Sequence, residues 1–467
     1  MFTNVLVFLG VLTTLASATD YQPAPPIFNA LEYTTWSKRH SGKSSIGEIM
    51  VPFTAEDGTD DFVKMTRLDL VGDARTRGYD HGYLMAADIL RFVEVDLNKY
   101  FMDMVLDLNM IDTTDMPKAL QDIFEVIKVK GALAAPGAFN KAFAWVYASE
   151  EEFVPQNLVE EMDGMGEGIC AGLSKVKSDC DPVAMTELVK NVNMLPELIR
   201  MACTAWGAWG KATGSEGTLV QLRALDFGGG PFANHTVITT NREEGKQAFA
   251  AVSFPGFVGV ITGVSESGVG ISEKVWMTYD KRSMQKGSYE GEADIFVLRD
   301  ILEHSKNKAD AEAYLSQVPR TWGMWIGVGD YETQQFDLVG YKQDSAIAYT
   351  DVTMPSMTEM PYLESVCYVD KHPQPSHDGV NGTLPTFLTD YYGDLSMENA
   401  RIGVRHHETG DVHIASYDFG KKQMIVSIGR INEKGEYGPL GGDDMNVWKA
   451  YNRPYIQFDL EELWQGH

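Results

Sequence analysis

The chain has 467 residues and a net charge of −27 at pH 7. Apolar residues make up 44% of the sequence and aromatic residues 11%, which is ample material for a core and argues against long-range disorder. A surface this acidic repels phosphate groups. The composition therefore argues against nucleic acid as a partner and against electrostatic docking on anionic lipid.

The N-terminus has the pattern of a secretory signal peptide over residues 1–18. The stretch from Val5 to Leu15 is mostly apolar, and Ala16-Ser17-Ala18 resembles a signal-peptidase site. No later apolar stretch is long enough to span a bilayer. Two glycosylation sequons, at Asn234 and Asn381, agree with the secretory pathway. We therefore expect a soluble protein of the lysosomal lumen or the extracellular space, and partial protonation of the acidic surface fits an acidic lumen.

The first half of the chain is predicted to be mainly helical. Residues 20–60 are rich in Pro, Ser, Thr and charge, and we expect them to be loosely ordered. The alternation over residues 64–72 predicts a strand. A helix then follows, because four apolar residues form one stripe at helical spacing: Ile89, Phe92, Val93 and Leu97. Residues 115–202 are also mainly helical in pattern.

After residue 203 the period of the apolar residues changes from about 3.6 to about 2. Short strands joined by Gly-rich turns are predicted at 218–227, 236–240, 248–253, 257–262 and 269–272. Two helices follow, at 293–305 and 308–318. Strands return at 324–328, 345–350, 411–418 and 423–430. Successive hairpins favour antiparallel sheets with helices on their outer faces.

Cys203 lies where the period changes, at the start of the first hairpin of the second half. An N-terminal Cys carries its own base, since an α-amine has a pKa of about 7.7–8.0 and a thiol about 8.5. Freeing that amine requires a cut before Cys203. The thiol itself can make this cut by attacking the carbonyl of Ala202 in an N→S acyl shift.

Arg223 and Asp226 follow on the returning strand. A nearby Arg favours the thiolate, and an Asp can accept a hydrogen bond from the α-ammonium, which completes a nucleophile–base pair ordered by a third group. Residues three apart on a strand point to opposite faces, so a bulge or a strand end must intervene if both side chains reach Cys203. Taken alone, a Cys at a strand start is usually a core residue.

Cys203-Thr204, followed by the strand Arg223-Ala224-Leu225-Asp226-Phe227, resembles the signature of one branch of the N-terminal-nucleophile hydrolases. This branch contains acyl-CoA:6-aminopenicillanate acyltransferase-like proteins, acid ceramidase and N-acylethanolamine amidase. Further segments are similar in the same order: 77–82, 161–168, 254–263, 267–272 and 298–303. The resemblance covers roughly residues 64–350.

The resemblance implies a four-layer αββα sandwich with antiparallel sheets and a mostly helical N-terminal segment. It also implies a cut between Ala202 and Cys203, which would give an α-chain of 19–202 and a β-chain of 203–467. We expect the two chains to remain associated. The sequence leaves the oligomeric state open.

The resemblance also assigns roles to individual residues. Cys203 would be the nucleophile, with Arg223 and Asp226 as its supports. In ceramidase-like members a later Gly-Gly-Asn supplies an oxyanion-hole amide, whereas this chain has Gly327-Val328-Gly329-Asp330. A carboxylate cannot donate unless it is protonated, so Asp330 departs from the pattern and backbone N–H groups are the alternative donors.

The reaction implied is hydrolysis of a linear, non-peptide amide, such as an N-acyl lipid or an N-acyl amino compound, through an acyl-enzyme on Cys203. Two alternatives remain. One is an acyltransferase that passes the acyl group to an amine. The other is a non-catalytic lumenal binding protein on the same fold with Cys203 uncut. No cofactor is expected for any of them.

The chain has four cysteines, too few for a disulfide scaffold. If Cys203 is catalytic, at most one bridge forms within the chain. Cys170–Cys180 is the shortest-range pair, and a bridge from either of these to Cys367 is the alternative. No CxxC motif or His/Cys cluster indicates a metal site.

Overall fold

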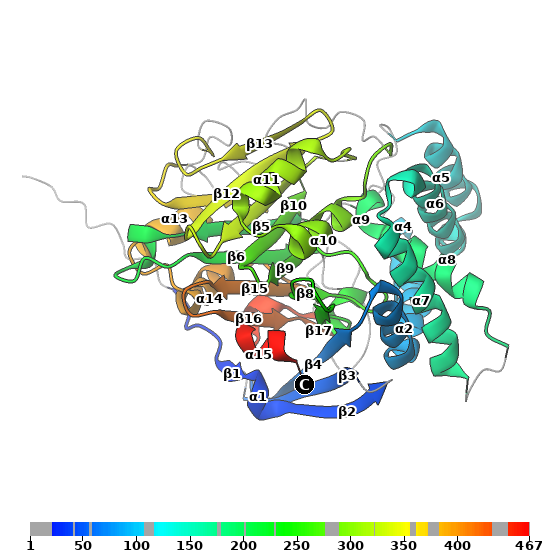
Figure 1. Ribbon diagram of the computed structural model, residues 1–467, viewed down its shortest axis with the longest axis horizontal. Coiled ribbons are helices and arrows are strands. Elements are labelled where there is room, and N and C mark those ends of the chain that lie inside the picture. The colour runs from blue at the N-terminus through cyan, green and yellow to red at the C-terminus, as the bar shows by residue number, and fades with distance from the viewer. Residues whose placement is uncertain are drawn as a thin grey trace, which may run out of the picture.

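The computed structural model describes residues 21–40, 43–55, 58–106, 116–174, 179–199, 202–227, 230–275, 289–321, 323–354, 361–371, 383–431 and 447–466. The predicted signal peptide at 1–18 and the sequon at Asn381 lie outside these ranges. The fold is a mixed α/β architecture built on two large sheets, with helices around them (Figure 1).

The larger sheet has ten strands in the order β13-β12-β11-β10-β9-β8-β7-β4-β3-β2. Its pairs are antiparallel except β4–β7, so this sheet departs from the purely antiparallel prediction at the point where the N-terminal half joins the second half. The strand bounds in chain order are β2 Thr34–His40, β3 Ser44–Thr54, β4 Asp60–Val71, β7 Val237–Arg242, β8 Phe249–Ser253, β9 Thr262–Ser265, β10 Val269–Val275, β11 Met324–Asp330, β12 Gln335–Lys342 and β13 Ser345–Tyr349.

The second sheet has seven strands in the order β1-β19-β16-β15-β6-β5-β14. Here β1 pairs parallel to β19, which ties the N-terminal segment to the C-terminal end. The strand bounds are β1 Ile27–Asn29, β5 Ala202–Ala208, β6 Val220–Asp226, β14 Val366–Val369, β15 His413–Asp418, β16 Gln423–Ile428 and β19 Tyr455–Asp459. A small separate pair joins β17 Arg430–Ile431 to β18 Val447–Trp448.

Helices surround the sheets in two groups. The N-terminal group stands to one side of the sheets (Figure 1) and comprises α2 Ala74–Leu84, α3 Ala86–Leu90, the π-helix Arg91–Asp96, α4 Leu97–Leu106, α5 Lys118–Lys130, α6 Ala135–Glu150, α7 Gln156–Leu173, α8 Pro182–Asn193 and α9 Leu195–Leu198. The others are α1 Ala30–Tyr33, α10 Asp294–His304, α11 Lys308–Gln317, α13 Thr383–Asp390, α14 Met397–His406 and α15 Leu460–Gln465. None of the helices within the described ranges is long and apolar enough to cross a bilayer.

Separate apolar cores hold these elements together. One core lies between the two sheets and includes Trp325 and Tyr417. A second packs α13 and α14 on the seven-stranded sheet and includes Phe387 and Trp206. A third packs α10 and α11 on the ten-stranded sheet around Leu298. Each helix and each sheet face therefore buries its apolar side against a neighbour, as a layered domain requires.

Helices α2 and α7 approach unusually closely through glycines. A Cβ added at Gly78 would lie 1.8 Å from the Glu161 carbonyl oxygen, and one at Gly168 would lie 2.0 Å from that of Tyr79. Only a residue without a side chain fits such a contact. The two upstream segments that resemble the hydrolase branch thus form one packed helix pair.

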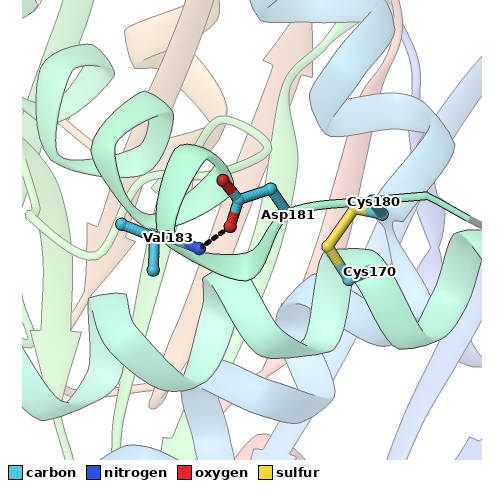
Figure 2. The surroundings of a disulfide bond; sticks show 4 residues. All are labelled: Cys170, Cys180, Asp181 and Val183. Carbon is cyan, nitrogen blue, oxygen red and sulfur yellow. Dashed lines mark hydrogen bonds between the residues drawn. A yellow bond between two sulfur atoms is a disulfide. The ribbon is translucent and has the colours of Figure 1, made fainter.

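A disulfide joins Cys170 to Cys180 and links the end of α7 to the start of α8. Figure 2 shows the bridge beside Asp181, whose side chain accepts a hydrogen bond from the Val183 N–H at 3.0 Å and caps α8. The shortest-range of the predicted pairings is therefore confirmed. Cys367 is buried on β14 as a free thiol.

The expectation of loose order over residues 20–60 is wrong for most of that segment, since β1, α1, β2 and β3 lie within it. On β3, Ile49 and Val51 are buried whereas Met50 is exposed. This is the period-2 pattern of a strand with one face covered. The sequence therefore contained the alternation of a strand at β3, although the polar composition of the surrounding residues favoured loose order.

The strand predicted at 257–262 is also wrong, because regular pairing begins only at Thr262. The amide side chain of Asn193, at the end of α8, forms hydrogen bonds with the backbone of this segment instead. Its Oδ1 accepts from the N–H groups of Val258 (2.9 Å) and Gly259 (3.2 Å), and its Nδ2 donates to the Gly256 carbonyl (2.9 Å). A side chain distant in sequence thus replaces a neighbouring strand.

Candidate active site

Cys203 is the second residue of β5 and is fully buried. It faces Leu225 of β6, and both side chains belong to the apolar core that the N-terminal helices share. Ala202, which precedes it, is only partly buried. The candidate nucleophile therefore lies at the end of the β5–β6 strand pair, where it packs against the helices of the first half of the chain.

The Arg223 guanidinium binds the sulfur of Cys203. Arg223 lies opposite Ala205 and therefore on the same face of the sheet as Cys203, and its Nη2 is 3.1 Å from Cys203 Sγ. The rest of the guanidinium is held by the facing sheet. Its Nη2 also reaches Glu273 Oε2 at 3.0 Å, its Nε donates to the Glu273 carbonyl at 2.7 Å, and its Nη1 donates to Thr262 Oγ1 at 2.7 Å.

The electrostatics around the sulfur favour the protonated thiol in the intact chain. Burial raises the pKa of Cys203 to about 12, and the positive charge of Arg223 only partly offsets this rise. Burial also raises the pKa of Glu273, which Arg223 again opposes. The thiol of the uncut chain is therefore neutral, because burial disfavours the thiolate more than the Arg223 charge favours it.

Three groups at this site were not found from the sequence: Glu273, Lys274 and His413. Glu273 and Lys274 are consecutive buried charges on β10, a pattern unusual enough to have served as a signal. His413 Nε2 lies 3.2 Å from Arg223 Nη1. Burial holds the pKa of His413 well below its ordinary value, so the neutral ring accepts this bond.

Asp226 does not reach the sulfur. The β5–β6 register runs without a bulge and places Asp226 opposite Ala202, so its side chain points to the other face. There its Oδ2 accepts from Thr409 Oγ1 at 2.5 Å and its Oδ1 accepts from the Gly410 N–H at 2.8 Å. Asp226 thus flanks the Ala202–Cys203 peptide bond from the opposite face to Arg223.

Asp330 lies away from Cys203, at the far end of β11. Its Oδ2 accepts from the Lys308 N–H at 3.1 Å, at the start of α11, and its Oδ1 from the Glu332 N–H at 2.8 Å, in the turn after β11. It pairs with Val269, four residues along β10 from Glu273. At a rise of about 3.3 Å per residue, four residues along β10 separate Asp330 by about 13 Å from Glu273, the residue of β10 that contacts Arg223. The structure therefore does not bring Asp330 to the nucleophile.

Asn234, the one sequon residue within the described ranges, is exposed at the end of a 3-10 turn. Its side-chain Oδ1 accepts a hydrogen bond from the Ile431 N–H at 2.9 Å.

A buried ion network connects the first half of the chain to the second. Arg77 Nη2 lies 3.1 Å from Glu161 Oε2, and its Nη1 lies 2.7 Å from Glu243 Oε2. Arg299 Nη2 contacts the same Glu161 oxygen at 2.9 Å and Glu303 Oε1 at 2.8 Å. Such pairs are costly to separate once they are buried.

Among the described residues, one group has the spacing of metal ligands: Asp300, Glu303 and His304. Glu303 already binds both Arg77 and Arg299, and His304 is largely exposed. We therefore interpret these three residues as part of the buried ion network and not as a metal site.

No protein-family model matches the sequence. The Dictyostelium discoideum protein dcd1A is 30% identical over 411 residues, which cover 85% of this chain and 85% of dcd1A. Protein dcd1B of the same organism is 29% identical over 425 residues, which cover 86% of this chain and 76% of dcd1B.

Two solved structures are more distantly similar. A Caenorhabditis elegans N-acylethanolamine-hydrolyzing acid amidase ortholog has a TM-score of 0.35 and 14% identity, with 53% of this chain and 99% of that chain covered. A mutant conjugated bile acid hydrolase from Clostridium perfringens has a TM-score of 0.33 and 11% identity, with 54% and 98% covered. Likenesses this distant establish neither the fold class nor the activity of this chain.

Proposed function

This chain belongs to the family of the Dictyostelium discoideum proteins dcd1A and dcd1B, and we propose, from the surroundings of Cys203, that it is a cysteine N-terminal-nucleophile hydrolase. It cuts its own chain between Ala202 and Cys203 and then hydrolyses a linear amide. The observation that carries the proposal is the 3.1 Å contact between Arg223 Nη2 and Cys203 Sγ at the start of β5.

The proposed fold class is the four-layer αββα sandwich. Its support is the packing of the two sheets on one another, with α10 and α11 outside one sheet and α13 and α14 outside the other. In such a sandwich a nucleophile at the start of a strand is exposed only when the chain before it has been cut. The N-terminal helices cover that end here.

Self-cutting follows from the chemistry of the thiol. Cys203 Sγ attacks the carbonyl carbon of Ala202, the C–N bond breaks, and the thiol proton passes to the departing amide nitrogen. Water then hydrolyses the thioester. The products are an α-chain of 19–202, which ends in a carboxylate, and a β-chain of 203–467, which begins with the free amine of Cys203.

Amide hydrolysis then uses the new amine as the base. It takes the thiol proton, the thiolate attacks the substrate carbonyl, and the α-ammonium gives that proton to the leaving amine. Arg223 stabilises the thiolate and Asp226 accepts a hydrogen bond from the α-ammonium. Water finally attacks the acyl thioester and releases the acid. No step requires a cofactor.

The proposed substrate is an N-acyl lipid or N-acyl amino compound, because Cys203, besides its charged neighbours, belongs to an apolar core that contains aromatic rings. The rings of Phe232, Phe254 and Phe257 belong to the same core as Cys203. The ring centroids of Phe232 and Phe254 are 5.2 Å apart, and those of Phe254 and Phe257 are 5.7 Å apart. The Phe254 ring lies 5.9 Å from that of His413, which contacts Arg223. An acyl chain would gain free energy by contacting such side chains.

The two chains are proposed to stay together after the cut. The support is the parallel pairing of β4 with β7 and of β1 with β19, together with the buried network of Arg77, Glu161 and Arg299. All three join residues before the cut to residues after it.

We also propose that the protein enters the secretory pathway through residues 1–18, carries glycans at Asn234 and Asn381, and acts in the lysosomal lumen or outside the cell. The acidic composition supports an acidic compartment, where partial protonation relieves the repulsion within a net charge of −27.

The decisive experiment is intact-mass measurement and N-terminal sequencing of the protein from its native compartment and after incubation at acid pH. The expected result is a chain that begins Cys203-Thr204-Ala205 and that is absent from Cys203→Ala. Cys367→Ala, which removes the other buried free thiol, is the matched control and should still be cut. A wild-type chain that stays uncut would defeat the proposal, and cutting in Cys203→Ala would assign the cut to another protease.

A panel of fatty-acyl amides then identifies the substrate. Adding an amine acceptor separates hydrolysis from acyl transfer, since a transferase converts the acceptor into a new amide whereas a hydrolase releases the free acid.

A further inference from the structure

The guanidinium of Arg223 uses each of its N–H donors once. Its Nε donates to the Glu273 carbonyl at 2.7 Å, and its Nη2 donates to Cys203 Sγ at 3.1 Å and to Glu273 Oε2 at 3.0 Å. Its Nη1 donates to Thr262 Oγ1 at 2.7 Å and faces His413 Nε2 at 3.2 Å. A guanidinium has five N–H donors and no acceptor, so the contact with His413 is a hydrogen bond only if Nε2 presents a lone pair.

This contact determines the tautomer of His413. With the lone pair on Nε2, the neutral ring carries its proton on Nδ1. Burial, followed by the positive charge of Arg223, holds the pKa of His413 well below its ordinary value, which agrees with a neutral ring. The side chain is fully buried, and its Nδ1 has no hydrogen-bond partner among the described residues. Within the described part of the chain, Arg223 is therefore the polar partner of this ring.

Strand register places His413 and Cys203 on either side of Leu225. Leu225 of β6 pairs with Cys203 of β5 on one side and with His413 of β15 on the other. Directly opposite residues point to the same face, so His413 lies on the face from which Arg223 reaches the sulfur. Neighbouring strands lie about 4.8 Å apart, which puts the backbones of His413 and Cys203 about 10 Å apart. The Arg223 guanidinium spans this gap, with Nη2 at the sulfur and Nη1 at the ring.

We propose that His413 is a positioning residue for the nucleophile: its Nε2 lone pair holds the Arg223 guanidinium in the orientation that directs Nη2 at the sulfur of Cys203. The proposal rests on the function proposed above. A neutral acceptor suits this task, because it orients the cation without neutralising it. A second carboxylate at this place would also bind the guanidinium, but it would oppose the thiolate that Arg223 stabilises.

The test compares substitutions that keep or remove the acceptor. His413→Gln keeps an amide oxygen that can reach the place of Nε2, whereas His413→Leu fills the place of the ring without any polar atom. Mass spectrometry over time measures self-cutting, and Tm confirms that each variant is folded. If His413→Leu does not fold, His413→Asn takes its place, since its amide is too short to reach Arg223.

We expect His413→Leu to be cut about tenfold more slowly than the wild type and His413→Gln to remain within about threefold of it. His406→Leu, at a half-buried histidine whose ring packs on Tyr21, is the matched control and should be cut at the wild-type rate. Normal cutting in His413→Leu would overturn the proposal. An equal loss in His413→Gln would overturn it as well, because the effect would then come from packing of the ring.

A double-mutant cycle shows whether His413 acts through Arg223. Arg223→Lys removes Nη1, the atom that His413 binds, so adding His413→Leu to it should slow self-cutting by less than about twofold. A side chain that supports only the fold would slow both backgrounds by the same factor. Equal factors would therefore overturn the proposal.

The tautomer of His413 gives a test that needs no activity. NMR of the ring nitrogens is recorded on the uncut Cys203→Ala chain, with His413→Gln to assign the signals. The expected ring is neutral and protonated at Nδ1, and a proton on Nε2 would overturn the proposal. The two possible failures are distinguishable. A wild-type chain that is never cut removes the proposed function and leaves this tautomer in place, whereas failure of this proposal alone leaves a chain that cuts normally in His413→Leu.

Discussion

Arg223 lies diagonally across the β5–β6 pair from Cys203, and its Nη2 contacts both the Cys203 sulfur at 3.1 Å and a Glu273 carboxylate oxygen at 3.0 Å. One guanidinium therefore connects the candidate nucleophile on one sheet to a carboxylate on the other. Its remaining N–H groups are bound by the Glu273 carbonyl, by Thr262 and by His413. This arrangement fixes the cation, so its position and not only its charge is available for chemistry.

Replacing Arg223 by Lys should lower the rate of self-cutting by at least about tenfold, since losing about 1.4 kcal/mol of stabilisation in the transition state has that effect. A Lys keeps the charge but cannot supply the fork of donors that binds four residues at once. Mass spectrometry over time measures the rate. Arg75→Lys, at an exposed ion pair with Glu167, is the control and should be cut normally. A normal rate in Arg223→Lys would show that charge alone suffices.

Three buried carboxyl groups lie together between the two halves of the chain: Glu150 on α6, Glu197 on α9 and Asp294 on α10. The Asp294 N–H donates to Glu197 Oε1 at 2.9 Å. Burial, followed by the charges of the neighbouring carboxylates, raises the pKa of Glu150 and of Asp294 well above the ordinary range. At least one of these groups therefore holds a proton at acid pH.

This cluster predicts that stability falls as pH rises toward neutrality. A group whose folded pKa is raised binds its proton more tightly in the folded state, so its contribution is complete at acid pH and is lost as pH rises through the folded value. Glu150→Gln should therefore raise Tm near neutral pH and flatten the Tm–pH curve. Glu151→Gln, the exposed neighbour, should leave the curve unchanged. Parallel curves for the two variants would contradict the prediction.

Asp330→Ala should lower the free energy of unfolding by about 1 kcal/mol, because Asp330 accepts hydrogen bonds from the Lys308 N–H at the start of α11 and from the Glu332 N–H. Self-cutting should persist at the wild-type rate, since this carboxylate does not approach Cys203. Urea denaturation measures the first effect and mass spectrometry the second. Asp344→Ala, at an exposed turn, is the control for stability. Loss of self-cutting in folded Asp330→Ala would restore an oxyanion role.

Gly78→Ala should destabilise the protein by about 1–3 kcal/mol or more, because the added methyl group would collide with the Glu161 carbonyl at 1.8 Å. Gly137→Ala is the matched helical control, since an added Cβ there meets nothing within 4 Å. That variant should gain about 0.5–1 kcal/mol. Urea denaturation compares the two variants. Equal effects would mean that α2 and α7 can move apart at little cost.

Much of the second half could be predicted from local pattern. The strands expected at 218–227 and 423–430 and the helix at 308–318 correspond to β6, β16 and α11 within a few residues. Their apolar residues recur at the period of the element, because each packs one face on a core. The prediction of a strand at 257–262 was wrong because the side chain of Asn193, from a helix far earlier in the chain, binds the backbone of this segment.

The site could be predicted only in part. Arg223 and Asp226 were assigned as supports of Cys203 by the resemblance to a known hydrolase branch, and strand alternation correctly required the two side chains to face opposite sides of the sheet. Glu273 and His413 come from strands distant in sequence, β10 and β15. No local period records such contacts.

The sequence by itself determined the period of most elements and the position of Cys203 where helix gives way to sheet. It left two kinds of disulfide pairing open, and the structure decided for Cys170–Cys180. Only the tertiary structure decided which charges surround that sulfur, and that Asp330 is not among them. The reason is physical: periodicity reflects burial of a single element. The environment of a side chain depends instead on which sheets and helices pack together, and that choice is made by the whole chain.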